Sequence, residues 1–142
     1  MPSLADVNFL FALINDQHSQ HTIARQWFGS IEIAGDLAVC RVAQMGLLRL
    51  LTNPKAMLSN PLSMKDAWQI YDTLMTDDRL TYLEAEPTRL HAIWRKLTIT
   101  SMSRNAWTDA YLAAFALAAD LAMVTFDRDF KQFANLHTVI PS

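Results

Sequence analysis

The sequence predicts an α/β protein in which helices cover both faces of a central parallel sheet. Short apolar runs alternate with segments whose apolar residues recur at helical spacing, which is typical of strands joined by helical crossovers. The apolar run at residues 121–126 lacks the alternation of a half-exposed strand, as expected where both faces of a sheet are covered. With 142 residues and 51% hydrophobic content, the chain suits a single domain over residues 1–142.

The first half of the chain predicts two strands, each followed by helical sequence. In order, we expect a short strand ending at residues 4–5, a helix over 7–14, a helix from 18 to 29, a strand over 37–42 and a helix over 45–51. Asp6 stands at the first strand-to-helix junction, where an N-cap is the ordinary structural explanation for an aspartate. Pro54 marks the end of the last of these helices, because proline and the residue before it resist helix formation.

The second half repeats the alternation. In order, we expect a helix capped by Ser63 that runs to Met75, a strand over 80–83, a helix that Pro87 opens, a helix over 109–119, a strand over 121–126 and an edge strand over 136–140. Thr108 or Asp109 suits the N-cap or first turn of the alanine-rich helix. Trp27, Trp68 and Trp94 stand at helical spacing from other apolar residues, so we expect them in the core rather than as base-stacking platforms.

Charge and composition limit the class of protein. The formal net charge of −2 argues against nucleic-acid binding through overall positive charge and leaves only local basic patches. No apolar stretch reaches the roughly 18 residues of a membrane span, and no basic residue precedes the first apolar run as it would in a signal peptide. The lone Cys40 sits in an apolar run and is expected to be a buried thiol. These features predict a cytoplasmic protein.

Four side chains that suit a metal site follow the predicted strands or open a helix beside them. If the strands are parallel, Asp6, Gln44, Asp109 and Asp127 all lie near one edge of the sheet. Carboxylates gathered without matching bases repel one another, and Mg²⁺ or Mn²⁺ is a common remedy. Each aspartate alone also makes sense as a cap or turn residue. Their joint placement favours a metal site for phosphodiester hydrolysis.

The pieces ADVNFL, CRVAQMGLLRLLTNP, WTDAYLAAFA and MVTFDRDF resemble the PIN-domain ribonucleases, specifically the VapC-type toxins of bacterial toxin–antitoxin pairs. The resemblance implies a PIN-like α/β/α sandwich with endonuclease action on RNA that depends on Mg²⁺ or Mn²⁺. It also implies a cognate antitoxin protein as partner and a homodimer. Position by position, it assigns Asp6, Asp109 and Asp127 as metal-binding and catalytic residues, and Thr125 as the hydroxyl residue two positions before Asp127.

Gln44 departs from the family pattern, in which many members carry a glutamate. The neutral oxygen of Gln44 can still coordinate or hydrogen-bond, but the lost charge should weaken the second of two metal positions. We assign Asn8, Gln44, Thr125 and Asp129 to supporting roles, positioning water or ligands. The candidates for phosphate contacts, for which ordinary salt bridges are the alternative, are Arg41, Arg49, Arg104, Arg128 and Lys131.

Two other functions compete with the nuclease. A degenerate PIN-like domain that binds protein partners without cleaving RNA is suggested by Gln44. An acidic-pocket signalling module would need a phospho-accepting aspartate after the central strand and a nearby lysine. Here the strand at residues 80–83 is followed by Glu84, and Lys131 is the one lysine near a suitable place.

Overall fold

The computed structural model describes residues 1–101, 103 and 106–142. Five strands form one sheet in the order β3-β2-β1-β4-β5, and each neighbouring pair is parallel. The strands are β1 (Ser3–Ala5), β2 (Leu37–Cys40), β3 (Leu80–Leu83), β4 (Ala122–Val124) and β5 (Thr138–Val139). The expected parallel sheet is therefore confirmed, and β5 lies at an edge as predicted.

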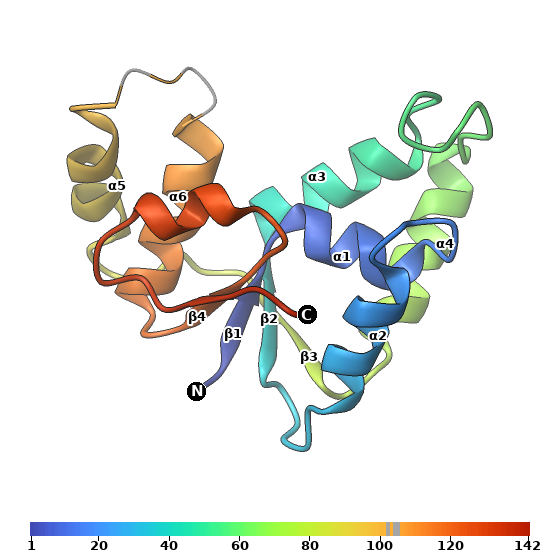
Figure 1. Ribbon diagram of the computed structural model, residues 1–142, viewed down its shortest axis with the longest axis horizontal. Coiled ribbons are helices and arrows are strands. Elements are labelled where there is room, and N and C mark those ends of the chain that lie inside the picture. The colour runs from blue at the N-terminus through green and yellow to red at the C-terminus, as the bar shows by residue number, and fades with distance from the viewer. Residues whose placement is uncertain (102, 104–105) are drawn as a thin grey trace.

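Helices cover the two faces of this sheet (Figure 1). They are α1 (Val7–Ile14), α2 (His21–Gly29), α3 (Arg41–Leu51), α4 (Met64–Met75), α5 (Leu90–Thr98), α6 (Ala106–Ala118) and the 3-10 helix η1 (Arg128–Gln132). Helices α1 to α4 lie on one side, and α5, α6 and η1 lie on the other. This is the α/β/α arrangement that the sequence predicts.

The strand order explains the two layers. From β1 the chain steps through β2 to β3 in one direction, and it then crosses back to β4 and β5 on the opposite side of β1. Because parallel crossovers are right-handed, reversing the direction moves the connecting helices to the opposite face. The strand order therefore reverses its direction between β1 and β4, which is the switch point of the sheet. A crevice opens at the carboxyl ends of the strands at such a switch point, where open α/β sheets bind their ligands.

The core is built where the helices press on the sheet. Phe9 and Leu10 of α1 are fully buried, and so are Ala113 and Ala114 of α6. The small alanine side chains let the α6 backbone approach the sheet closely, while Phe115 supplies bulk and is 2% exposed. Among the described residues, no helix combines the length and apolar character needed to cross a membrane.

Three local predictions differ from the structure. Strand β2 ends at Cys40, so Gln44 lies in the first turn of α3 and not beyond the end of a longer strand. Helix α6 begins at Ala106, three residues before the expected start at residue 109, while Asp109 lies in its first turn as one of the two predicted placements has it. Trp68 is 47% exposed, so its core assignment is wrong, because the side of α4 that packs inward carries Ala67 and Tyr71.

Candidate functional site

Asp6 lies at the switch point and serves two structural roles. It is the first residue after β1 and the N-cap of α1, and its Oδ1 accepts a hydrogen bond of 2.7 Å from the backbone N–H of Val7. Its own N–H donates to the Val124 carbonyl of β4, at 3.0 Å. Only 6% of Asp6 is exposed. The N-cap interpretation is therefore confirmed, and the second carboxylate oxygen remains for other contacts.

Thr125 follows β4 and holds that second oxygen. Its hydroxyl donates to Asp6 Oδ2 at 2.6 Å and accepts from the backbone N–H of Asp127 at 2.9 Å, and the residue is fully buried. Asn8 Oδ1 accepts from the Phe126 N–H at 3.1 Å and lies 3.3 Å from the same hydroxyl. The single hydroxyl proton is committed to the shorter, charge-assisted bond with Asp6. Thr125 and Asn8 thus fix the ends of β1 and β4 against each other.

Asp127 and Asp129 lie at the start of η1, just after β4. Asp127 is the N-cap of η1, and its Oδ1 accepts from the Asp129 N–H at 2.9 Å. Asp127 is half-buried, whereas Asp129 is exposed. One carboxylate oxygen of Asp127 is used by the cap, and the other accepts no hydrogen bond from the described residues.

Asp109 brings a carboxylate from α6 to the same place. Burial and the negative charges of Asp6, Asp127 and Asp129, in that order, raise the pKa of Asp109 to about 6. The pKa of Asp6 is also raised, chiefly by burial and in the same direction by the charge of Asp127, against the hydrogen bonds from Thr125 and Val7. Mutual repulsion of this kind requires carboxylates that are close in a poorly solvated place. We call these four aspartates the acidic edge.

The acidic edge has the chemistry of a hard-cation site, although its side chains do not close around a point. Among the described residues, no three His, Cys, Asp or Glu side chains form a cluster that could hold a metal ion as they stand. The aspartates are close enough to repel one another and yet do not surround a single point. Both observations suit Mg²⁺, which keeps several waters and is commonly held through one or two carboxylates and substrate phosphates. All donors at the edge are oxygens, which Mg²⁺ and Mn²⁺ prefer. The residues therefore fit such an ion.

Comparison with known proteins agrees with this geometry. The family model described as "PIN domain" matches residues 4–136. The chain belongs to the PIN-domain family. Ribonuclease VapC41 of Mycobacterium tuberculosis is 39% identical over 137 residues, covering 94% of each chain.

Solved structures share the fold at lower sequence identity. The crystal structure of VapC20 of M. tuberculosis, described as a sarcin-ricin loop cleaving toxin, has a TM-score of 0.72 and 18% identity, covering 97% of this chain and 98% of that one. VapBC2 from Rickettsia felis, bound to a DNA fragment from its promoter, has a TM-score of 0.67 and 15% identity, covering 98% of both chains. At these identities the likeness shows the fold alone.

In this PIN domain Gln44 is engaged by a side chain of its own helix. Gln44 is 7% exposed, and its Oε1 accepts a hydrogen bond of 2.6 Å from Arg41 Nη1. The Arg41 guanidinium carbon lies 5.2 Å from the centroid of the Tyr82 ring. The oxygen that the sequence offered as a replacement ligand is thus already a hydrogen-bond acceptor. Spacing along the helix allows the Arg41–Gln44 pair, but nothing local in the sequence points to Tyr82.

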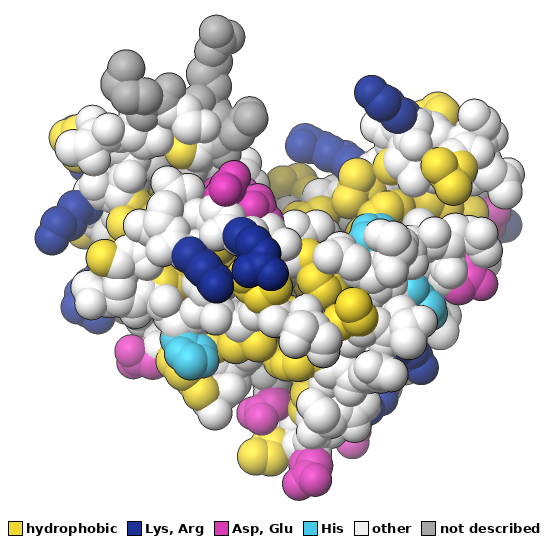
Figure 2. All heavy atoms as spheres, in the orientation of Figure 1, with side chains coloured by type: hydrophobic (Ala, Val, Ile, Leu, Met, Phe, Trp, Pro, Cys, Tyr) yellow, Lys and Arg dark blue, Asp and Glu magenta, His cyan; other side chains and the backbone are white. Residues whose placement is uncertain are grey.

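The other predicted phosphate contacts that the structure describes lie on η1 and α3. Arg128 and Lys131 are exposed on η1, and Arg49 is exposed in the last turn of α3. Arg104 lies outside the described residues. Figure 2 shows basic and acidic side chains adjoining each other near the notch between the α5–α6 side and the α3–α4 side. Arg128 and Lys131 therefore share η1 with Asp129.

One further contact of the PIN domain was not predicted. The Tyr111 hydroxyl donates to Glu86 Oε2 at 2.6 Å, which ties the segment after β3 to the helix that carries Asp109. Burial and the bond to Glu86 raise the pKa of Tyr111. The two residues are 25 positions apart, so no local sequence signal could have revealed the contact.

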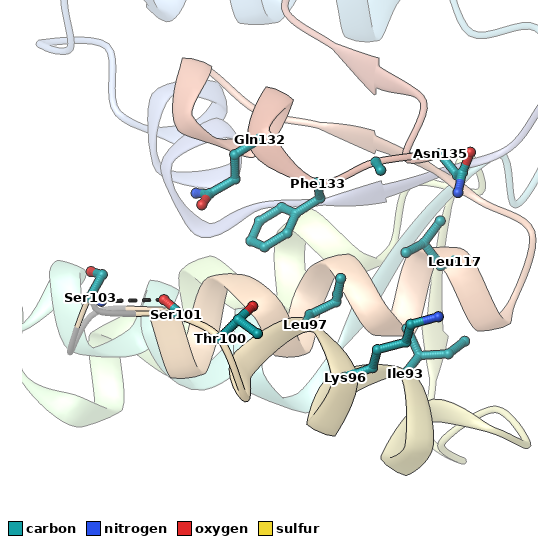
Figure 3. A pocket seen from close by; sticks show the side chains of 11 residues that line it. Ile93, Lys96, Leu97, Thr100, Ser101, Ser103, Leu117, Gln132, Phe133 and Asn135 are labelled. Atoms are coloured by element: carbon teal, nitrogen blue, oxygen red, sulfur yellow. Dashed lines mark hydrogen bonds between the residues drawn. The ribbon is translucent and has the colours of Figure 1, made fainter.

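A separate groove of about 790 Å³ lies between α5, the end of α6 and the segment after η1 (Figure 3). Its apolar floor includes Leu97, Leu117 and Phe133, and polar side chains such as Lys96 and Gln132 surround it. Among its described lining residues there is no member of the acidic edge. The carboxylates and this groove are different features of the surface.

Proposed function

We propose that this PIN domain is an endoribonuclease dependent on Mg²⁺ or Mn²⁺, and that it acts in the cytoplasm as the toxin of a type II toxin–antitoxin pair. The observation that carries the proposal is the buried Asp6, bonded to Thr125 and electrostatically coupled to Asp109, at the switch point of a parallel sheet. The 39% identity to a protein named as a ribonuclease supports the reaction.

The proposed roles follow from the contacts of each carboxylate. Asp6 and Asp109 are the main ligands, and Asp127 completes the set directly or through water. Thr125 and the Val7 N–H hold Asp6 in one orientation, so its carboxylate needs little rearrangement on binding. The metal ion, when bound, supplies an activated water and stabilises the anionic oxygens of the phosphate.

The proposed reaction also needs a group that accepts the proton of the attacking water. Asp109 has a pKa of about 6, so its carboxylate is mostly deprotonated at pH 7 and becomes protonated in mildly acidic solution. In the proposed reaction a carboxylate oxygen of the acidic edge orients the attacking water and takes up its proton. The water oxygen bonds to phosphorus as the bond to the leaving ribose oxygen breaks.

The proposed substrate and partners are argued from the principles of RNA recognition and from the shared fold, in addition to the carboxylates. Unpaired loops are the expected RNA targets, because sequence-specific recognition of RNA mostly uses unstacked bases. The fold shared with a toxin–antitoxin complex from Klebsiella pneumoniae supports a cognate antitoxin as partner, and a homodimer is the expected assembly for this type of toxin.

The reaction is tested by incubating purified protein with a pool of structured and single-stranded RNAs in Mn²⁺, Mg²⁺ or EDTA. We expect cleavage in either metal ion and none in EDTA. Asp6→Asn and Asp109→Asn should abolish cleavage while remaining folded, because each removes a proposed ligand. Asp72→Asn, which changes an exposed aspartate of α4, is the matched control and should cut like the wild type. Equal cleavage by all four proteins, or cleavage that persists in EDTA, would contradict the proposal.

A further inference from the structure

The side chain of Arg41 is held in place at the carboxyl edge of the sheet. Nη1 donates to the buried Gln44, and the guanidinium carbon lies 5.2 Å from the Tyr82 ring centroid. Such stacking and hydrogen bonding restrict a side chain that is otherwise flexible. Among the described side chains, the ion pair closer than 4.0 Å is Arg79 with Asp77, so Arg41 has no carboxylate partner there. Most of its N–H donors remain free for a ligand.

The backbone places Arg41 at the strand end adjacent to that of Asp6. Strands β1 and β2 are parallel neighbours with Leu4 opposite Ala38, so Asp6 and Arg41 follow adjacent strand ends at nearly the same level. Helix α3 packs tightly on the beginning of α1, since a Cβ at Gly46 would lie 2.6 Å from Val7 Cγ2. Arg41 and Asp6 therefore begin two helices that are locked together.

The negative charge of the acidic edge favours a cation beside it when a phosphate approaches. Asp6, Asp109, Asp127 and Asp129 gather there, and an RNA phosphate that approaches them adds further negative charge. A carboxylate at position 44 could help to hold a second metal ion. In this chain the residue is a neutral Gln44 whose Oε1 is bonded to Arg41. The first turn of α3 thus presents a held guanidinium at residue 41 and no carboxylate at residue 44.

We propose that Arg41 is a phosphate-binding residue of the nuclease site, and that Gln44 and Tyr82 position its guanidinium for this contact. The inference rests on the proposed ribonuclease function. A guanidinium suits this role because its planar set of donors matches two phosphate oxygens and its charge does not depend on pH. Gln44 then serves as a positioning residue through its bond to Arg41.

The test measures RNA binding without metal and therefore does not depend on turnover. A fluorescein-labelled single-stranded RNA is titrated with protein in EDTA over a series of salt concentrations, and anisotropy gives Kd. We expect Arg41→Gln to raise Kd by about tenfold at low salt and to lower the slope of log Kd against log salt by roughly 0.7, the loss of one single-strand phosphate contact. Arg41→Lys should lie between the wild type and Arg41→Gln, because it keeps the charge without the planar donors.

The matched control is Arg25→Gln, which removes the same charge from the exposed face of α2. The charge of Arg25 acts on Asp77, which precedes β3 and so lies toward the opposite edge of the sheet. The Arg25→Gln variant should therefore bind RNA like the wild type. Gln44→Glu should also weaken binding, because a carboxylate there would hold the guanidinium as an ion pair. If folded Arg41→Gln matches the wild type in both Kd and salt slope, the proposal is overturned.

Asp6→Asn separates this inference from the proposed function. It should lose cleavage but bind RNA in EDTA at least as tightly as the wild type, since it removes a negative charge from the edge. If the wild type cuts no RNA in any metal ion while Arg41→Gln still binds more weakly with a reduced salt slope, the nuclease assignment fails and the phosphate contact stands. If cleavage follows the predictions and Arg41→Gln binds normally, the nuclease stands and the role of Arg41 is wrong.

Discussion

The hydroxyl group of Thr125 joins the ends of two strands that are 119 residues apart in the chain. It donates to Asp6 Oδ2 and accepts from the Asp127 N–H, so one buried atom fixes two of the proposed ligands. Threonine is suited to this place because its hydroxyl provides both a donor and an acceptor, while its methyl group packs in the core. Few other side chains combine these properties in so small a volume.

Replacing Thr125 with valine keeps the shape and removes the hydroxyl. We expect Thr125→Val to lower the free energy of unfolding by about 1–3 kcal/mol, because a buried acceptor and a buried donor lose their partner. Affinity for Mn²⁺ should fall by roughly tenfold or more, since Asp6 is no longer held. Urea unfolding and titration calorimetry measure the two effects.

Thr125→Ser is the control for this change, because it retains the hydroxyl. It should bind Mn²⁺ nearly as well as the wild type, with a small loss of stability from the missing methyl group. Unchanged Mn²⁺ affinity in Thr125→Val would show that the hydroxyl does not position the ligand.

At the scale of elements, the contact between α3 and α1 holds the starts of these two helices side by side at the carboxyl ends of β1 and β2. Gly46 is an interior residue of α3, and a Cβ there would lie 2.6 Å from Val7 Cγ2 and 3.1 Å from Val7 Cγ1. The valine cannot easily turn away, because a β-branched side chain has one preferred rotamer in a helix. The absence of a side chain at residue 46 thus permits the approach of the two helices that begin beside Asp6.

Gly46→Ala tests this contact. In an open helix the change would stabilise by about 1 kcal/mol. Here we expect a net loss of roughly 1–2 kcal/mol in urea unfolding, because the added methyl overpacks the interface. Combining it with Val7→Ala should recover much of the loss, so that the double variant is more stable than the sum of the single changes predicts.

Gly29→Ala provides the comparison. Gly29 is the last residue of α2, and a Cβ there would meet nothing within 4 Å. It should leave stability unchanged or raise it slightly. A Gly46→Ala protein that is as stable as Gly29→Ala would refute a tight α1–α3 contact.

At the scale of the whole molecule, the acidic edge makes stability depend on pH. The pKa of Asp109 is raised from 3.8 to about 6 in the folded protein, so between these values the folded state binds more protons than the unfolded state. The stabilisation that protonation gives is complete below about pH 4 and is lost as the pH rises through about 6. Asp6 contributes in the same direction, because its pKa is raised as well.

We therefore expect the metal-free protein to become less stable from pH 4 to pH 7 through this group. Asp109→Asn should be more stable than the wild type by about 1–2 kcal/mol at pH 7.5. This is less than the full shift of the Asp109 pKa would give, because the side chain is partly solvated. The difference should vanish near pH 4. Thermal unfolding in EDTA at several pH values measures it, and a variant that is less stable than the wild type at pH 7.5 would contradict the repulsion.

The order of elements and the identity of the acidic residues could be read from the sequence because their signals are local. The apolar run that becomes β4, the Ser63 cap of α4 and the aspartates after β1 and β4 are each visible within a few residues. The resemblance of four segments to PIN-domain nucleases added the family, which the comparisons confirm. The roles of the individual site residues remain predictions.

Tertiary structure alone decided how these residues act on one another. The strand order brings Thr125 to Asp6, and burial together with neighbouring charges raises the pKa of Asp109. Packing also exposes Trp68 and sets Arg41 against Tyr82. Long-range contacts and desolvation depend on which surfaces of distant segments meet. The spacing of residues along the chain specifies local geometry but does not determine these contacts between distant segments.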